Sequence, residues 1–346
     1  MNGESPGGGS VVSLRFRRSD HDVTNTVQVS STEAVAEAVH DIFCRIYPGA
    51  SWQPLRRAFR DFDDLFHGRL PGYLGCDTVY HDIQHTLDGV LALARLIQGH
   101  EISEPPQRRL GPGRATVGLM TALFHDAGYI RHSSDEGHLN GAEFTQQHVT
   151  RSAHFIERYM AQAGMGAAGS IARQIVHYTG YEVLYPQIYT SNEKDRRLGY
   201  LVGTADLMSQ MADRCYLEKC RDRLFPEFVL GGLAMYIGPN GKMVVRYRSG
   251  IDLLRRTLDF FETVCTPRFE EDFGGVHRYL TAIYNGRNPY MVALEKNIFY
   301  LKRLMRGESW PLLRRTPPCI LAEGETVEKT RRMVADRLRE LRRRAA

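Results

Sequence analysis

A histidine-aspartate pair, His125-Asp126, stands at the end of a mostly apolar run and could do chemistry there. The preceding segment, 117–124, has the composition of a buried helix. Burying two adjacent ionisable groups is costly unless a partner compensates for the lost hydration, and a bound metal ion compensates well. An imidazole and a carboxylate together suit a hard to borderline divalent ion. A helix C-terminus ending at Gly128 is the alternative, and it explains the glycine but not the two polar residues.

Three further segments carry residues of the same chemical types. His81 and His85 are four positions apart and therefore share one helix face, although two exposed histidines would have the same spacing. Asp206 lies in the apolar stretch 201–208, where a carboxylate needs a partner; a buried arginine or a neighbouring helix end could also be that partner. Nine of the 13 histidines fall between His81 and His177, which favours a site over random surface placement.

The ordered set Tyr80-His81-x-x-x-His85, His125-Asp126 and Asp206 resembles the HD-domain metal-dependent phosphohydrolase superfamily, which includes the cyclic-nucleotide phosphodiesterases. The resemblance covers roughly residues 52–220. It implies an all-helical domain that binds one or two divalent ions (Mg, Mn, Zn, Fe or Co). The ligands that it implies are His85, His125, Asp126 and Asp206, with Asp126 bridging to a second ion where one is present. It implies catalytic roles for Asp126 and for His81, the latter as general acid on the leaving oxygen.

Two positions depart from the cyclic-nucleotide enzymes that the chain resembles. Those enzymes usually have asparagine in place of Asp82 and a further histidine in place of Tyr129. The glutamine with which they clamp the base has no identified counterpart here. A cyclic nucleotide is therefore one candidate substrate among several phosphoesters.

Three histidines are candidate ligands for a second metal: His148, His154 and His177. His148 and His154 are six positions apart in one predicted helix, so they point in different directions and one of them is expected to face the site. We favour His148, because the segment 147–153 resembles the Glu-x-x-Ser-Ala segment of bacterial superfamily members. His177 resembles the extra histidine of the dinuclear members. A surface or core histidine without a ligand role is the alternative for each.

Three functions are compatible with these residues. The leading hypothesis is metal-dependent hydrolysis of a small-molecule phosphoester, a nucleotide or cyclic nucleotide, by metal-activated water with His81 as general acid. The second is a mixed-valent di-iron oxygenase, an activity of some superfamily members, with the ligands His85, His125, Asp126, His148, His177 and Asp206. The third is a regulatory module that binds metal without turnover.

Helical periodicity runs through nearly the whole chain and predicts an all-α fold. The resemblance implies a helical bundle of the HD-domain type. After Tyr80, apolar residues recur at steps of three and four as far as a helix end at Gly99. Further helices are expected over about 115–126, 142–163, 171–178, 195–219, 251–264 and 288–305. Two short apolar segments that flank Gly238-Pro239-Asn240-Gly241 predict a small β-hairpin.

The 346 residues divide into four expected parts. These are a disordered, Gly- and Ser-rich segment at 1–30, an HD-type domain at 31–225, a helical extension packed on it at 226–310, and a linker with a basic helix at 311–346. From residue 325 onward there are eight Lys/Arg and four acidic residues, which account for most of the net charge of +5. Such a tail could contact nucleic acid or anionic lipid, but a solvated terminal helix is the favoured interpretation.

Composition also bounds the cellular setting. No run approaches the roughly 18 apolar residues of a membrane span, and residues 1–25 lack the apolar stretch of a secretory signal. The six cysteines are scattered without a CxxC pair, which indicates free thiols in a reducing compartment. We therefore expect a cytoplasmic protein whose partner is a small-molecule substrate, and the sequence predicts no particular oligomeric state.

Overall fold

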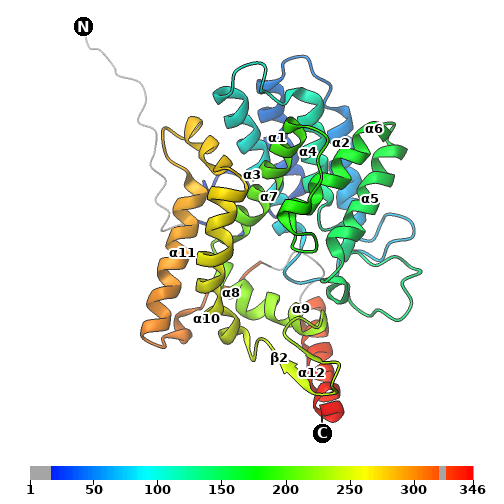
Figure 1. The fold of residues 1–346 in the computed structure, drawn as a ribbon, viewed down its shortest axis with the longest axis vertical. Helices are drawn as coiled ribbons and strands as arrows, with labels where there is room; N and C mark the ends of the chain where they lie inside the picture. Colours follow the sequence, from blue (N-terminus) through cyan, green and yellow to red (C-terminus); the bar gives the residue numbers. More distant parts are fainter. Residues whose placement is uncertain (1–16, 319–324, 346) are drawn as a thin grey trace.

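Helices make up most of the computed structural model, which describes residues 17–318 and 325–345 (Figure 1). The α-helices are α1 (Thr32–Ile46), α2 (Gln53–Phe66), α3 (Ile83–Ser103), α4 (Gly111–Phe124), α5 (His148–Gln162), α6 (Gly166–Ile175), α7 (Glu193–Ala212), α8 (Tyr216–Lys219), α9 (Phe225–Leu230), α10 (Gly250–Phe260), α11 (Pro289–Arg306) and α12 (Glu325–Ala345). Two short strands, β1 (Met235–Ile237) and β2 (Met243–Val245), pair antiparallel with Tyr236 opposite Val244. The predicted all-α class and the predicted hairpin are both confirmed.

Helix α3 is the central element of the bundle. It packs against α1, α4, α7 and the 3₁₀ segment Val276–Ala282, and eighteen of its 21 residues are buried. Its sequence is apolar on nearly every side, as a helix surrounded by other helices requires. Asp82 caps its N-terminus by accepting a hydrogen bond from the His85 amide at 2.9 Å. His85 therefore lies in the first turn, and His81 lies immediately before the cap.

The predicted helix end at Gly99 is wrong, because α3 continues through this residue to Ser103. Gly99 is instead a point of close approach between two backbones. A Cβ atom placed on it would collide with the carbonyl oxygen of Tyr279 in the segment Val276–Ala282. Because glycine has no side chain, α3 and this segment can pack closely at Gly99. The helix itself ends at Ser103, where its apolar pattern ends.

Two other helices begin or end elsewhere than expected, and both differences have local causes. The helix predicted from about residue 142 begins at His148, because Asn140 and Glu143 form a capping box around a short 3₁₀ turn, Gly141–Phe144. The helix predicted to run to about residue 219 is interrupted after Ala212. There Asp213 accepts a hydrogen bond from the Cys215 amide at 2.6 Å, and α8 begins a new turn.

The N-terminal segment was predicted to be disordered over residues 1–30. Residues 1–16 lie outside the described part of the chain, but for residues 17–30 the prediction is wrong. Asp22 is completely buried, and Arg95 of α3 pairs with it at 2.8 Å. The amides of Thr26 and Val27 donate to the same carboxylate at 2.9 and 2.8 Å. A polar segment is thus fixed by a buried ion pair, which composition does not reveal.

Asp22→Asn is expected to reduce stability at neutral pH and to flatten its acid dependence. Burial opposes ionisation of Asp22, but Arg95 and hydrogen bonds from Thr24 and Val27 outweigh it and lower its pKa from 3.8 to about 2. A carboxyl group whose pKa is lower in the folded state than in the unfolded state stabilises the fold at pH values above its unfolded-state pKa. This contribution is lost as the pH falls through the folded-state pKa. Asp22 should therefore contribute about 2 kcal/mol above pH 4 that disappears toward pH 2.

Urea unfolding of both proteins between pH 6 and pH 2.5 measures this contribution. The difference in unfolding free energy between wild type and Asp22→Asn should narrow as the pH falls, because asparagine does not titrate. A difference that stays constant over this interval would contradict the assigned ion pair.

In the C-terminal third, α11 packs against α7, α8 and α10, on the side of the view opposite α5 and α6 (Figure 1). The predicted boundary at residue 226 falls inside α9, and α12 packs on α9, β1 and β2. Five cysteines are free thiols, as predicted, while Cys319 lies outside the described residues. Among the described residues, we find no helix with both the length and the apolar content that a membrane crossing requires.

Candidate metal centre

Four polar side chains from three helices meet in the interior of the bundle. His85 comes from the first turn of α3, His125 and Asp126 follow the last residue of α4, and Asp206 comes from the middle of α7. His85 Nε2 lies 3.4 Å from Asp126 Oδ2 and 3.2 Å from Asp206 Oδ1. His125 Nε2 lies 3.2 and 3.5 Å from the same two oxygens. Both nitrogens therefore face both carboxylates.

Three of these atoms are buried without hydrogen-bond partners. His125 Nε2, Asp126 Oδ2 and Asp206 Oδ1 all lack one, although an unpaired buried polar atom costs free energy. His125 Nδ1 lies 2.8 Å from the carbonyl oxygen of Ala122. Donation of the Nδ1 proton to that carbonyl leaves a lone pair on Nε2, which is the arrangement of a metal-bound histidine. The unpaired atoms and this tautomer both fit a cation at the centre of the cluster.

The spacing of the donor atoms also fits one ion. Donor atoms of His85, His125 and Asp126 lie within 4.8 Å of one another, so this group could hold a metal. Asp206 Oδ1 joins the group through its short distances to both histidines. Nitrogen and oxygen ligands about 2.0–2.2 Å from a common ion are roughly 3.0–3.5 Å from their neighbours. The observed histidine-to-carboxylate distances of 3.2–3.5 Å lie in that interval.

The charges of the cluster depend on one another. Burial opposes protonation of the two imidazoles, but Asp126 and Asp206 outweigh it and raise the pKa of His85 to about 9 and that of His125 well above its ordinary value. Burial favours the neutral carboxyls, but the histidines outweigh it and lower the pKa of Asp126 and of Asp206. Protons and a metal ion would compete for the same nitrogens, so metal binding is expected to release protons from the cluster.

Gly128 holds the turn after His125-Asp126 against α5. Its amide donates to Ser152 Oγ at 2.8 Å, and a Cβ atom on it would collide with the carbonyl oxygen of His148. The glycine is therefore required by close backbone packing and not by a helix C-terminus. This contact brings the first residue of α5, His148, next to Asp126.

His148 lies beside the second oxygen of Asp126. Its Nε2 atom is 4.0 Å from Asp126 Oδ1, and its Nδ1 atom lies 2.7 Å from the carbonyl oxygen of Thr145. Burial lowers the pKa of this histidine, which favours the neutral imidazole. The ring of Tyr129 stacks on both His81 and His148, with centroid distances of 4.4 and 4.3 Å. Tyr129 thus fixes the positions of two histidines that both face the centre.

A buried glutamate orients His81. Glu227 Oε2 lies 2.6 Å from His81 Nδ1, and the Glu227 side chain is only 1% exposed. Its other oxygen accepts hydrogen bonds from the amides of Val79 and Tyr80 at 2.7 and 2.5 Å. Because Nδ1 is occupied, Nε2 is the nitrogen of His81 that remains for another partner. Asp82, by contrast, caps α3 and pairs with Arg223 at 3.3 Å.

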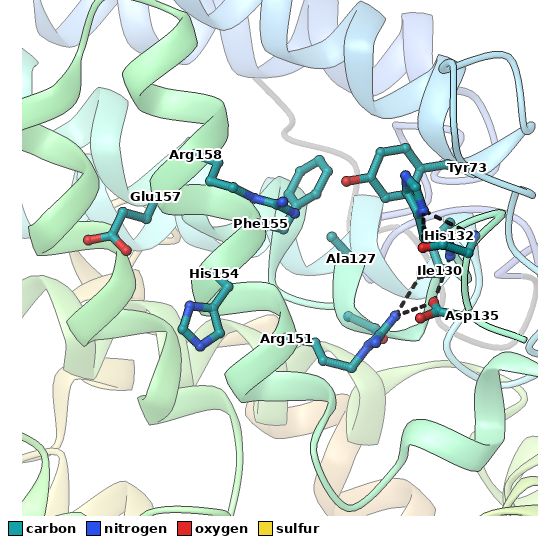
Figure 2. A pocket seen from close by; sticks show the side chains of 12 residues that line it. Tyr73, Ala127, Ile130, His132, Asp135, Arg151, His154, Phe155, Glu157 and Arg158 are labelled. Atoms are coloured by element: carbon teal, nitrogen blue, oxygen red, sulfur yellow. Dashed lines mark hydrogen bonds and ion pairs between the residues drawn. The ribbon is translucent and has the colours of Figure 1, made fainter. Parts of the chain in front are cut away.

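The other two histidine candidates lie away from this cluster. His154, on α5, lines a separate cavity of about 530 Å³, together with Arg151, Phe155 and Arg158 (Figure 2). His177 lines another surface cavity, next to Arg173 and Gln174. Neither residue lines the cavity around Asp126. The structure thus places His148 beside Asp126, and His154 and His177 in two other cavities.

The position of His177 follows from the 3₁₀ turn Val176–Thr179. Val176 and Tyr178 are buried in this turn, so His177 between them is directed to the opposite side. Residues 179–182, which follow, line the site instead. The sequence 175–178 is apolar around His177 and does not reveal which side of the turn faces the site.

His177→Ala is expected to leave the metal content unchanged, whereas His148→Ala should weaken binding of a second ion by about tenfold or more. The physical reason is the different placement of the two rings, one in a remote surface cavity and one 4.0 Å from Asp126 Oδ1. Titration of each metal-free variant with Mn²⁺ or Zn²⁺, with the stoichiometry determined by elemental analysis, measures the effect. Loss of metal from His177→Ala at wild-type stability would contradict this assignment.

The cluster of His85, His125, Asp126 and Asp206 opens into a cavity of about 540 Å³. Its polar lining includes His81, His85, His125, Asp126, Tyr129, His148 and Asp206. Much of the rest of the lining is apolar and comes from residues 207–260, including Leu224, Phe228, Leu233, Tyr247 and Phe260. Two arginines, Arg246 and Arg256, also line the cavity. Such a lining accommodates both an organic group and an anion.

The sequence interpretation did not identify Glu227 or Glu182. Glu227 is an acidic residue among apolar ones at 225–230, the same signal that singled out Asp206. It lies beyond the predicted domain, which ends at residue 225. Glu182 accepts hydrogen bonds from the amides of Val149 and Thr150 at 2.7 and 2.9 Å and so caps α5. No local sequence signal marks that contact.

Comparison with known proteins adds no assignment. No family model, no curated protein and no solved structure matches this chain. The conclusions on function therefore depend on the residues and geometry described above.

Proposed function

We propose that this protein is a metal-dependent hydrolase of phosphoesters, related to the HD-domain phosphohydrolases and acting on a nucleotide-type substrate. The observation that carries the proposal is the cluster of unpaired buried donor atoms at His125, Asp126 and Asp206. These atoms share one cavity with His81, whose ring a buried carboxylate holds in place. Metal ligands and a positioned proton donor are the two components that hydrolysis of a phosphoester requires.

His85, His125, Asp126 and Asp206 would hold a divalent ion. Bound there, such an ion supplies an acidified water as nucleophile and neutralises the charge of phosphate oxygens. Asp126 has one oxygen toward the two histidines and the other toward His148. Asp126 and His148 would therefore contribute to a second ion, and a dinuclear site is compatible with this arrangement.

His81 would donate the proton that the leaving oxygen needs. Its Nδ1 atom is bound to Glu227, its ring is stacked on Tyr129, and its side chain is 16% exposed toward the cavity. In the reaction, water adds its oxygen to phosphorus, the bond from phosphorus to the ester oxygen breaks, and the His81 Nε2 proton passes to that oxygen. The Glu227 carboxylate would stabilise the positive charge of the protonated ring, and its bond to Nδ1 leaves Nε2 directed away from Glu227.

The alternative functions have less support. A di-iron oxygenase with six ligands requires His177, which lines a different cavity. A regulatory module without turnover has no need for His81, which is held at the metal cavity by a buried glutamate.

The test is a metal analysis combined with a substrate screen. The purified protein should bind a divalent ion and, with Mn²⁺, Mg²⁺ or Zn²⁺, hydrolyse bis-p-nitrophenyl phosphate, a dinucleotide or a 3′,5′-cyclic nucleotide. A chelator should abolish the activity, and added metal should restore it. Stoichiometric iron with a mixed-valent spectroscopic signal and no phosphoester hydrolysis would favour the oxygenase instead.

A further inference from the structure

The metal cavity adjoins a second hollow on the side of the β-hairpin and α12. This second cavity has a volume of about 510 Å³ and shares Gln146, Leu233 and Arg246 with the first. Its outer end is lined by Tyr236 of β1 and Arg337 of α12. Two hollows of similar size thus meet at Arg246, and only the first contains the metal ligands. A substrate with a single phosphate at the metal would leave the second one unused.

Two arginines are available to an anion here: Arg246 lines both cavities, and Arg256 lines the first. Among residues 17–318 and 325–345, neither Arg246 nor Arg256 forms an ion pair with a carboxylate. The guanidinium of Arg246 lies 5.5 Å from the ring centroid of Tyr236, and that of Arg256 lies 5.7 Å from the centroid of Tyr247. Each side chain is therefore placed against an aromatic ring, with its N–H groups left for a ligand.

Aromatic side chains line the same cavity as the candidate ligands and these arginines. Phe228 and Tyr247 lie with ring centroids 5.9 Å apart, and both line the metal cavity. Leu233 lies at the junction of the two hollows. Flat apolar surface of this kind suits a nucleobase or a sugar face. The lining of the two hollows thus combines a candidate metal site for one phosphate, an aromatic surface for an organic group, and cations for a second anion.

We propose, building on the phosphohydrolase function above, that the preferred substrate is a linear nucleotide diester that carries a second phosphate, of dinucleotide length or longer. The scissile diester binds at His85, His125, Asp126 and Asp206, and the second phosphate binds Arg246. Hydrolysis consumes one water and breaks one ester bond, and the leaving nucleotide oxygen takes its proton from His81. Arg246 selects the substrate through charge and takes no part in the bond-breaking step.

A matched pair of substrates tests the proposal. Thymidylyl-thymidine and its 5′-phosphorylated form contain the same scissile diester and differ in the second phosphate. Charge-assisted hydrogen bonds to an exposed arginine should raise kcat/KM for the phosphorylated form by about tenfold. Chromatography of the products measures cleavage of the diester bond in both dinucleotides. It also distinguishes this cleavage from removal of the terminal phosphate.

Arg246→Gln should reduce this preference to about one, chiefly through a higher KM for the phosphorylated dinucleotide. Arg248→Gln is the matched control, because Arg248 is an exposed arginine two residues away that lines neither cavity. Equal rates for the two dinucleotides in the wild type, or a preference that survives Arg246→Gln, would overturn the inference while leaving the phosphohydrolase proposal intact. Failure to hydrolyse any diester, bis-p-nitrophenyl phosphate included, would overturn both.

Discussion

Asp126→Asn is expected to remove the bound metal and to lower phosphoester hydrolysis by roughly 10³-fold or more. Asp126 faces His85 and His125 with one oxygen and His148 with the other, so no other residue of the cluster can replace it. Asparagine has nearly the same shape but lacks the negative charge, and its amide group donates where a ligand must accept. His125→Ala removes a second ligand of the same centre and is expected to have a similar effect.

The measurement combines metal content, thermal stability and kinetics. Wild type should unfold at a higher temperature with metal than with a chelator, because an ion that binds only the folded state stabilises it. Asp126→Asn should lose that difference and remain folded by circular dichroism. Asp135→Asn is the matched control, since Asp135 pairs with Arg151 at 2.8 Å and lines the cavity of Figure 2. Full metal content and full activity in Asp126→Asn would refute the proposed centre.

Three members of the cluster could be predicted from the sequence because each is a polar residue in an apolar segment or directly after one. His125-Asp126 follows the buried end of α4, and Asp206 lies between buried residues of α7. A polar side chain on the apolar face of a helix is carried into the core, where it needs a partner. The alternative for Asp206, a buried arginine, does not occur among the described residues, where its neighbours are His85 and His125. Burial cost was therefore the signal that singled out His125, Asp126 and Asp206.

The same reasoning fails where a contact depends on tertiary packing alone. His177 is in an apolar segment, yet a single 3₁₀ turn decides which way it points. Asp22 belongs to a polar segment that looks unstructured until Arg95 of α3 is placed beside it. Glu227 meets His81 across 146 positions of the chain. No periodicity within one segment encodes these contacts, because each requires two elements to be docked first.

His81→Ala is expected to lower kcat by about 10²–10⁴-fold on a nucleotide diester, whose leaving oxygen needs a proton. The same variant should retain most of its activity on bis-p-nitrophenyl phosphate, because p-nitrophenolate leaves without protonation. Metal content should not change, since His81 lines the cavity without belonging to the ligand cluster. The contrast between two leaving groups separates a proton donor from a residue that merely shapes the cavity.

Glu227→Gln examines the same role through a positioning residue. Glutamine keeps an oxygen for the amides of Val79 and Tyr80 but removes the charge that faces His81 Nδ1. The expected loss is smaller, on the order of 10-fold to 100-fold for the nucleotide diester, again with little change for the p-nitrophenyl ester. In the double variant His81→Ala/Glu227→Gln, the glutamate substitution should add almost nothing, because Glu227 acts through a ring that is no longer present. Additive losses would mean that Glu227 supports the site by another route, and equal losses on both substrates would exclude His81 as the proton donor.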